Sequence, residues 1–151
     1  MRYFLDTEFN GWGGALISLA LVPEFGDQEF YALLPLPDPL HPWVARNVVP
    51  YLRSVPPGLD GGIVTRLQAA AGIADYLARD DDPLIVADWP DDIAYFCALL
   101  VTGEGDMAAV GPLRFELIRT PGFSTAAASA VPHNALHDAR ALRDVAARWQ
   151  G

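Results

Sequence analysis

The opening segment of the chain carries two acidic side chains within an otherwise apolar and aromatic stretch. Asp6 and Glu8 lie two residues apart in residues 2–9, RYFLDTEF. If this stretch is a β-strand, alternate side chains share a face, so both carboxylates lie on the face that also holds Phe4. Their backbone positions are then roughly 6.6 Å apart, which allows both carboxylates to bind one divalent cation. The alternative interpretation is a strand that ends in polar residues before a turn.

A third acidic residue is expected to face the protein core. Asp138 lies in a predicted final helix, at residues 135–149, on its apolar stripe. The other members of this stripe are Leu142, Val145 and Trp149. A carboxylate that is buried away from water needs a positively charged group close by. For Asp138 that partner is either a metal ion or an arginine such as Arg66 or Arg119, whereas no lysine or arginine alternates with Asp6 and Glu8.

One histidine is placed where it could transfer a proton. His133 lies just before the final helix, for which Asn134 is the expected N-cap, so its side chain is free to point into a cleft. Histidine suits proton transfer near neutral pH, although an ordinary surface loop histidine is the alternative. His137 directly precedes Asp138 and points to another side of the helix, so we interpret it as structural or solvent-exposed.

Three further aspartates lie between a predicted strand at residues 84–87 and a predicted helix at residues 90–101. These residues are Asp88, Asp91 and Asp92. Acidic residues are common at helix N-termini, where they complement the helix dipole and the free amide groups. Open α/β sheets, however, also place their functional sites at the carboxyl ends of strands. Both interpretations stay open from position alone.

The pattern of apolar residues predicts the elements that must hold these side chains. The expected elements are strands at residues 2–9, 15–22, 29–34, 84–87 and 113–118 and helices at residues 43–52, 62–79, 90–101 and 135–149, with loops at residues 35–42 and 121–132. The expected core-facing residues are Ile63, Leu67, Ala70, Ala74 and Leu77 in the second helix and Ile93, Phe96, Cys97 and Leu100 in the third. Three antiparallel strands followed by strand–helix units indicate an α/β fold with a mixed five-stranded sheet flanked by helices.

Composition narrows the class of protein. The 151 residues suit one domain, residues 1–151, and 52% are hydrophobic while 19% are charged, as in globular proteins. No segment predicts a membrane span or a signal peptide, and the single Cys97 agrees with a reducing compartment, so we expect a soluble, cytoplasmic protein. The net charge of −9 argues against a non-specific DNA coat protein. It leaves open a nuclease whose acidic residues bind metal ions that receive phosphate.

Taken in order along the chain, these residues resemble the DEDDh, or DnaQ-like, 3′–5′ exonucleases, which have a ribonuclease H-like fold. The matching positions are Asp6, Glu8, Asp92, His133 and Asp138. The superfamily's second motif commonly reads Asn-x-x-Phe-Asp, and this chain has Asp88 and Asp91 at the Asn and Phe positions. The chain is similar in particular to the small bacterial branch typified by RNase AS, a polyadenylate-preferring exoribonuclease. That similarity comes from residues 2–9, from residues 43–52 and from the spacing between Asp92 and Cys97.

The resemblance implies a mechanism and a substrate. Asp6, Glu8 and Asp138 would hold one divalent ion, Asp6 would bridge to a second, and Asp92 would orient the second through waters. Mg²⁺ or Mn²⁺ suits such carboxylate ligands. His133 would accept a proton from the attacking water, and nucleoside 5′-monophosphates would leave the 3′ end of single-stranded RNA, with a preference for poly(A). The resemblance also implies a homodimer.

Aromatic residues near these motifs are candidates for binding the terminal base. Phe9, Trp12 and Trp89 could each stack on a base, or could serve only in core and turn packing. Three other activities compete with an exoribonuclease: a 3′–5′ DNA exonuclease of the same superfamily, a catalytically silent nucleic-acid-binding domain and an RNase H-type endonuclease. The complete acidic set disfavours the silent domain, and an Asp-x-Glu pair on one strand with a late His-x4-Asp disfavours the endonuclease. One cysteine and three histidines disfavour a zinc site.

Overall fold

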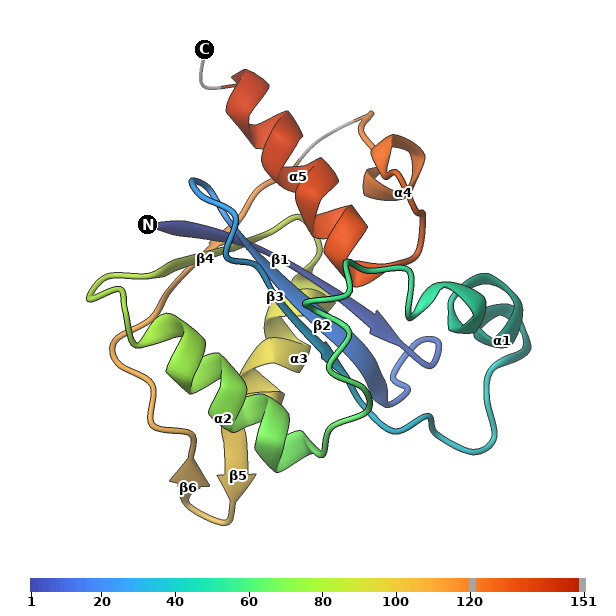
Figure 1. The fold of residues 1–151 in the computed structure, drawn as a ribbon, viewed down its shortest axis with the longest axis horizontal. Helices are drawn as coiled ribbons and strands as arrows, with labels where there is room; N and C mark the ends of the chain where they lie inside the picture. Colours follow the sequence, from blue (N-terminus) through green and yellow to red (C-terminus); the bar gives the residue numbers. More distant parts are fainter. Residues whose placement is uncertain (120–121, 150–151) are drawn as a thin grey trace.

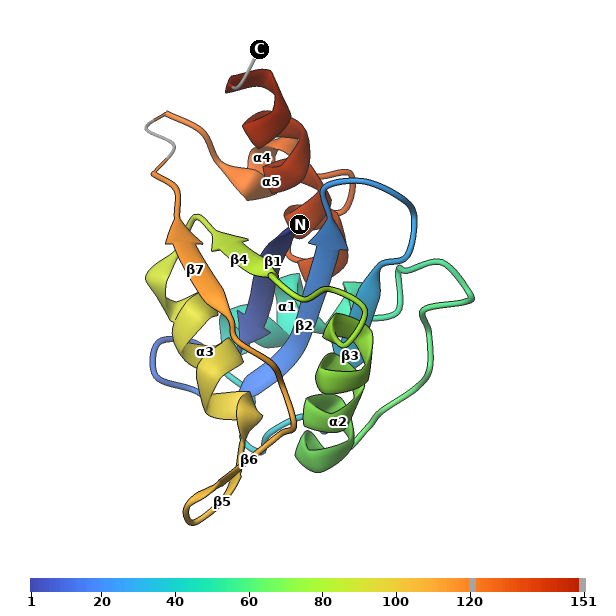
Figure 2. The ribbon, with the colours of Figure 1, turned by 90° about the vertical axis from the view of Figure 1, so that its left-hand side faces the viewer.

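The computed structural model describes residues 1–119 and 122–149, and these form a mixed sheet with helices on both faces (Figures 1 and 2). The five strands lie in the order β3-β2-β1-β4-β7. They are β1 Arg2–Phe9, β2 Leu16–Pro23, β3 Phe30–Leu33, β4 Leu84–Ala87 and β7 Arg114–Leu117. The first three are antiparallel neighbours, whereas β4 runs parallel to β1 and β7 parallel to β4. The expected α/β class and its mixed five-stranded sheet are therefore confirmed.

The helices agree with the sequence pattern in number and order, apart from short additions. They are α1 Pro42–Asn47, the 3₁₀ helix η1 Val49–Tyr51, α2 Arg66–Leu77, α3 Pro90–Leu100, α4 Thr125–Ala128 and α5 Ala135–Trp149. In the parts of the chain that the structure describes, none of these helices has the length and apolar character needed to cross a bilayer.

Two small elements were not expected. A two-stranded hairpin joins β5 Val101–Gly103 to β6 Asp106–Met107. The predicted loop at residues 121–132 contains α4, although residue 121 lies outside the described residues. The Ser124 hydroxyl accepts a hydrogen bond from the Ala127 N–H and so caps a run of alanines with high helix propensity.

The two faces of the sheet bury different helices. On one face, α2 and α3 pack against residues such as Leu5 and Ile85, and on the other α5 packs against Phe4 and Val86. Figure 1 shows α5 on one side of the strands and α2 and α3 on the opposite side. A third cluster packs α1 and η1 against Ile17 and Leu33 at the β3 end of the sheet. Alternate β1 side chains therefore face α5, as expected for Phe4, Asp6 and Glu8.

The expected inward stripe of the second helix is wrong at its beginning. Helix α2 starts at Arg66, where Thr65 and Gln68 form a reciprocal capping box, so Ile63 precedes the helix. Leu67 lies on the solvent side of the first turn and is 60% exposed. The helix instead buries a stripe of mostly small residues, which are Ala69, Ala70, Ile73, Ala74 and Leu77.

The predicted inward face of α3 is confirmed for Phe96 and Leu100, which are buried, and Ile93 is partly buried against the same core. The prediction is wrong for Cys97, which is exposed, and it omitted Leu99, which is buried. Asp92 is only 3% exposed and lies on this buried side, four and seven residues before Phe96 and Leu99.

The carboxyl end of β1, where the acidic residues lie, extends beyond the neighbouring strand β4. Strand β1 pairs with β4 from Arg2 to Phe4 and then continues to Phe9 without that neighbour. Asp6 and Glu8 therefore extend beyond the carboxyl end of β4, at the place where β4 leads into α3. Open α/β sheets bind ligands at such carboxyl edges.

Candidate active site

A cleft of about 570 Å³ lies at this carboxyl edge and contains all the acidic residues singled out above. Its lining includes Asp6, Glu8, Asp92, His133 and Asp138, together with the aromatic candidates Phe9, Trp12 and Trp89. The structure therefore brings together residues from β1, from the start of α3 and from both sides of the α5 N-terminus.

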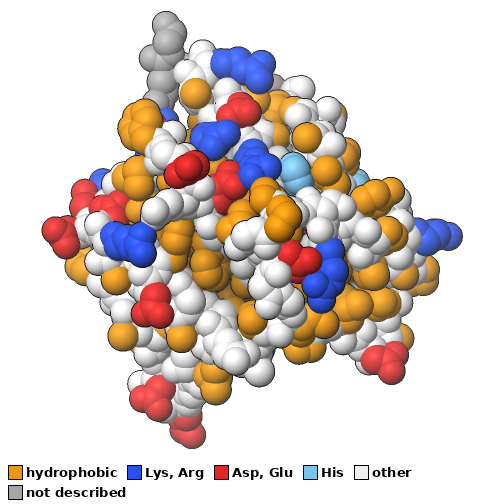
Figure 3. Space-filling model, in the orientation of Figure 1, with side chains coloured by type: hydrophobic (Ala, Val, Ile, Leu, Met, Phe, Trp, Pro, Cys, Tyr) orange, Lys and Arg blue, Asp and Glu red, His pale blue; other side chains and the backbone are white. Residues whose placement is uncertain are grey.

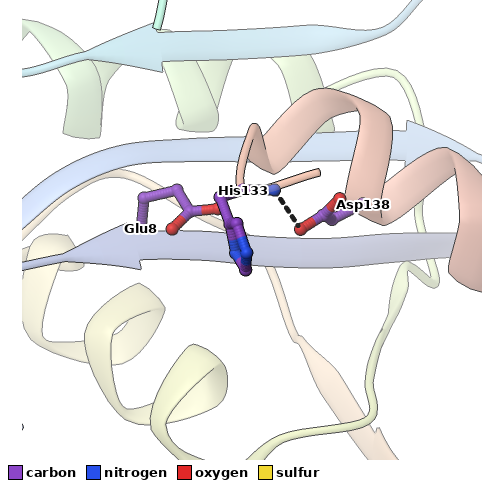
Figure 4. A group of neighbouring side chains, drawn as sticks. All are labelled: Glu8, His133 and Asp138. Atoms are coloured by element: carbon purple, nitrogen blue, oxygen red, sulfur yellow. Dashed lines mark hydrogen bonds between the residues drawn. The ribbon is translucent and has the colours of Figure 1, made fainter. Parts of the chain in front are cut away.

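Glu8, His133 and Asp138 form a compact group within this cleft. One potential ligand atom of each residue lies within 4.8 Å of the others. Figure 4 shows Glu8 projecting from β1 toward His133 and Asp138, which come from the loop before α5 and from its first turn. Asp6 lies close enough to Asp92, Glu8 and Asp138 for their charges to raise its pKa. Asp6 thus lies among the other carboxylates, outside the compact group.

The loop before α5 is shaped so that His133 and Asp138 meet. His133 adopts a left-handed backbone conformation, with φ of 62°, and its N–H donates to Asp138 Oδ2 at 3.2 Å. Asn134 caps the helix, since its side-chain oxygen accepts from the N–H groups of Leu136 and His137. This confirms the expected N-cap. The rings of His133 and Trp43 pack edge to face, with 4.8 Å between ring centres.

Asp138 is buried without the ion pair that was the alternative to a metal. It is only 4% exposed, and in the described ranges no arginine forms a salt bridge with it. Its Oδ1 atom is buried and has no hydrogen-bond partner among the described residues. The Ser129 hydroxyl lies near enough to lower the pKa of Asp138 but makes no hydrogen bond of ordinary geometry, and burial raises that pKa overall.

Asp92 differs from the two nearby aspartates, Asp88 and Asp91, in its hydrogen bonds and burial. Its Oδ1 accepts from both the backbone N–H and the hydroxyl of Thr7, at 3.1 and 2.6 Å, so α3 is tied to β1 between Asp6 and Glu8. Asp91 instead accepts from the Trp89 indole N–H at 3.2 Å, at the rim of the cleft. Asp88 is only partly buried. These contacts single out Asp92 as the buried member of the three.

The acidic residues repel one another and are poorly hydrated. Burial, followed by the charge of Asp138, raises the pKa of Glu8 to about 8. Burial also raises the pKa of Asp92 to about 7 against the opposing effect of the Thr7 hydroxyl. Burial and the neighbouring carboxylates, with Asp92 first among them, raise the pKa of Asp6 well above its ordinary value. Among the described residues none forms a salt bridge with these carboxylates. Oxygen donors that converge in this way, one of them an unpaired buried atom, fit a hard divalent cation such as Mg²⁺ or Mn²⁺.

These pKa shifts predict how the stability of the metal-free protein depends on pH. Between about pH 4.5 and about pH 8 the folded protein holds more protons on Glu8 than the unfolded chain does, and Asp6 and Asp92 act in the same direction. The free energy of unfolding should therefore fall as pH rises through this interval. We expect the Tm in EDTA to be lower at pH 8 than at pH 5 by about 5 °C or more. Added Mn²⁺ should remove most of the difference, and a Tm that rises with pH in EDTA would contradict the site.

A second prediction concerns the tie between Thr7 and Asp92. Thr7→Val keeps the shape of the side chain but removes the hydroxyl that holds Asp92 Oδ1. Groups that orient a metal-binding carboxylate typically contribute about 10- to 100-fold to metal affinity. We expect Mn²⁺ binding, measured by calorimetry, to weaken about tenfold in Thr7→Val, and Thr7→Ser, which keeps the hydroxyl, to bind like the unmodified protein. Equal affinity in the two variants would exclude this role of Thr7.

The aromatic candidates differ in their freedom to contact a ligand. Trp12 is 97% exposed in the turn after β1, and Trp89 is also exposed at the cleft rim. Phe9 lines the cleft, but its ring already stacks on Tyr95 at 4.6 Å between ring centres, which favours a packing role. The sequence interpretation did not assign His41 and Trp43 to the site, although both line this cleft. They lie in a Pro-rich loop and a short helix, and no signal in the sequence indicated that this segment would lie beside the acidic residues of β1.

His137 has a structural contact, as expected. Its Nε2 lies 2.8 Å from the Ser54 carbonyl oxygen, and the neighbouring Asn134 side chain donates to the Tyr51 carbonyl. These two contacts join the end of η1 and the residues that follow it to the start of α5. Away from the cleft, Figure 3 shows basic and acidic side chains alternating over α5, without a continuous basic patch on this face of the molecule.

No family model matches this chain, and no curated protein matches its sequence.

Proposed function

We propose that this protein is a metal-dependent 3′–5′ exoribonuclease of the DEDDh type, which removes nucleoside 5′-monophosphates from single-stranded RNA. The observation that carries the proposal is the convergence of four buried carboxylates and one histidine in an open cleft. These residues are Asp6, Glu8, Asp92, His133 and Asp138. They are the residues that the sequence resemblance assigned to catalysis, and they come from three separate segments of the chain.

The arrangement of strands supports the same proposal. A ribonuclease H-like fold has three antiparallel strands followed by parallel strands added on the side of the first, and the order β3-β2-β1-β4-β7 agrees with that plan. In this plan the first strand is central and carries acidic residues at its carboxyl end. Here β1 is the central strand and carries Asp6 and Glu8.

The donor set suits two divalent cations. Asp6, Glu8 and Asp138 would hold one ion, Asp6 would also contact the second, and Asp92 would orient the second ion. When bound, Mg²⁺ or Mn²⁺ would lower the pKa of a water molecule and stabilise charge on the leaving 3′-oxygen. The raised pKa values of Glu8, Asp92 and Asp6 describe the metal-free protein, in which burial and the neighbouring carboxylates disfavour the charged forms.

The remaining residues of the cleft would position and deprotonate the reactants. His133 would accept the proton of the attacking water, because it is the histidine in contact range of Glu8 and Asp138. Its backbone N–H, which donates to Asp138, keeps the ring near the acidic group while the ring itself stays free to take a proton. The exposed Trp12 and Trp89 would stack on bases of the single strand without reading their sequence.

Product identity and end dependence test this proposal. A linear RNA with a free 3′-hydroxyl should yield only nucleoside 5′-monophosphates, which chromatography separates from 3′-monophosphates. A circular RNA of the same sequence should remain intact. Cleavage of the circle would indicate an endonuclease, whereas faster cleavage of matched DNA would indicate a DNA exonuclease on the same site.

A further inference from the structure

His41 is held rigidly at the aromatic end of the cleft, and neither composition nor motif spacing assigned it a role. Its backbone N–H donates to Asn10 Oδ1 at 2.7 Å, and the Asn10 side-chain amide donates to the Pro39 carbonyl at 3.0 Å. Asn10 therefore fastens the loop before α1 to the turn that follows β1. This places His41 in the same cleft lining as Trp12 and the acidic residues.

The ring of His41 is fixed as well as its backbone. Its Nδ1 accepts the Trp43 N–H at 3.2 Å, so His41 is the N-cap of α1. The turn after β1 packs against the ring, since a Cβ at Gly11 would lie only 3.1 Å from His41 Cδ2. Gly11 has φ of +73°, which glycine adopts without strain. Two neighbouring segments thus hold the imidazole plane in place.

The hydrogen bond at Nδ1 decides what the other ring nitrogen can do. A nitrogen that accepts an N–H carries a lone pair, so the proton of the neutral ring is on Nε2. The hydrogen bonds of His41 to described residues involve its backbone and Nδ1, and none involves Nε2. His41 is solvent-exposed and lines the cleft beside the exposed rings of Trp12 and Trp43, so its Nε2–H is available to a ligand.

We infer that His41 Nε2–H recognises a neutral hydrogen-bond acceptor on the 3′-terminal nucleoside, either the ribose 2′-oxygen or a base acceptor. This inference rests on the proposed function, which places the scissile phosphate at the carboxylates. The nucleoside joined to that phosphate then extends toward the aromatic lining, where stacking holds its base and His41 supplies directional selectivity. His41 acts as a specificity-determining residue and takes no part in proton transfer.

Two substitutions separate this role from the capping role of His41. His41→Asn keeps a side-chain acceptor at the N-cap, where asparagine is among the best residues, but removes the distal donor. His41→Gln keeps a distal N–H donor and loses the cap acceptor. If His41 recognises the nucleoside, His41→Asn should lose selectivity at unchanged Tm. His41→Gln should keep most of the selectivity at a lower Tm.

The measurement compares kcat/KM for matched oligonucleotides that differ only in the last nucleotide. The first pair ends in adenosine or 2′-deoxyadenosine and tests the ribose 2′-oxygen. The second pair ends in adenosine or 7-deazaadenosine and tests N7 of the base. The third pair ends in adenosine or uridine and tests the other base acceptors. A single neutral hydrogen bond corresponds to about a three- to tenfold preference. We expect His41→Asn to lose one of these preferences, the first if the ribose is recognised and the second or third if the base is recognised. Unchanged ratios in His41→Asn would overturn the inference.

A binding measurement distinguishes this inference from the proposed function. Adenosine 5′-monophosphate with Mg²⁺ should quench the tryptophan fluorescence, with affinity about three- to tenfold weaker in His41→Asn than in the unmodified protein. If the unmodified protein binds the nucleotide with this difference but never cleaves RNA, the nuclease proposal fails and the role of His41 stands. If the protein cleaves RNA and His41→Asn binds the nucleotide equally well, the role of His41 fails alone. Absence of both binding and cleavage would reject both.

Discussion

Replacing Asp6 by asparagine is expected to lower RNA cleavage by about a thousandfold or more and, at the same time, to stabilise the metal-free protein. The loss of rate follows from removal of the carboxylate that would contact both metal ions, which corresponds to about 4 kcal/mol of transition-state stabilisation. The metal-free protein gains stability because the substitution removes a buried carboxylate that neighbouring acidic residues repel. Asp6 is then a buried acid whose pKa is raised by burial and by the charges of Asp92, Glu8 and Asp138.

The two effects are measured in separate experiments. Single-turnover cleavage with saturating Mg²⁺ gives the rate, and thermal unfolding in EDTA at pH 8 gives the stability, for which we expect a Tm about 3–6 °C higher in Asp6→Asn. Excess Mn²⁺ should reverse the order of the two Tm values, because only the unmodified protein has the complete ligand set. Asp81→Asn, at an exposed position outside the cleft, is the matched control and should change neither quantity. A variant that cleaves at the normal rate would refute the assignment of Asp6 to the metal site.

The second large effect is expected for His133. His133→Ala should reduce kcat by about 100- to 10,000-fold, the usual contribution of general acid–base catalysis, while Mn²⁺ affinity changes by less than tenfold. The distinction matters because His133 also lies within 4.8 Å of Glu8 and Asp138 and could instead bind a metal ion. Calorimetry with Mn²⁺ separates the two roles. A loss of Mn²⁺ binding that parallels the loss of rate would show that His133 is a metal ligand and not the general base.

His137→Ala is the matched control for His133, since it removes the other histidine of the same segment. It should lose the contact with the Ser54 carbonyl, which lowers stability by about 1 kcal/mol, and should keep kcat within about threefold. If His137→Ala instead carries the rate defect, the base has been assigned to the wrong histidine.

The acidic part of the site was predictable because its signals are local. Alternation along β1 placed Asp6 and Glu8 on the face of Phe4, and the period of α5 placed Asp138 on the stripe that holds Leu142. Both patterns depend only on residues close in sequence. The sheet order and the open edge beyond β4 then brought these local faces together.

The rest of the site depends on contacts between distant segments and had no local signal. Thr7 holds Asp92 from 85 positions away through two hydrogen bonds, and Asn10 holds the His41 backbone from 31 positions away through one. Such contacts leave no pattern in either segment. The inward face of α3 was mispredicted only in part. Apolarity placed Cys97 in the core, but Cys97 is exposed, and Leu99 is buried on the same side of the helix as Asp92.

The most direct test of the central claim is a time course on 5′-labelled single-stranded RNA with a poly(A) tail, in Mg²⁺, in Mn²⁺ and in EDTA, beside DNA of the same sequence. The proposed site predicts a ladder that shortens one nucleotide at a time from the 3′ end, faster on RNA than on DNA, and that is absent in EDTA and in Asp6→Asn. An intact labelled strand with either metal, in protein that thermal unfolding shows to be folded, would contradict the account and leave a nucleic-acid-binding domain without catalysis.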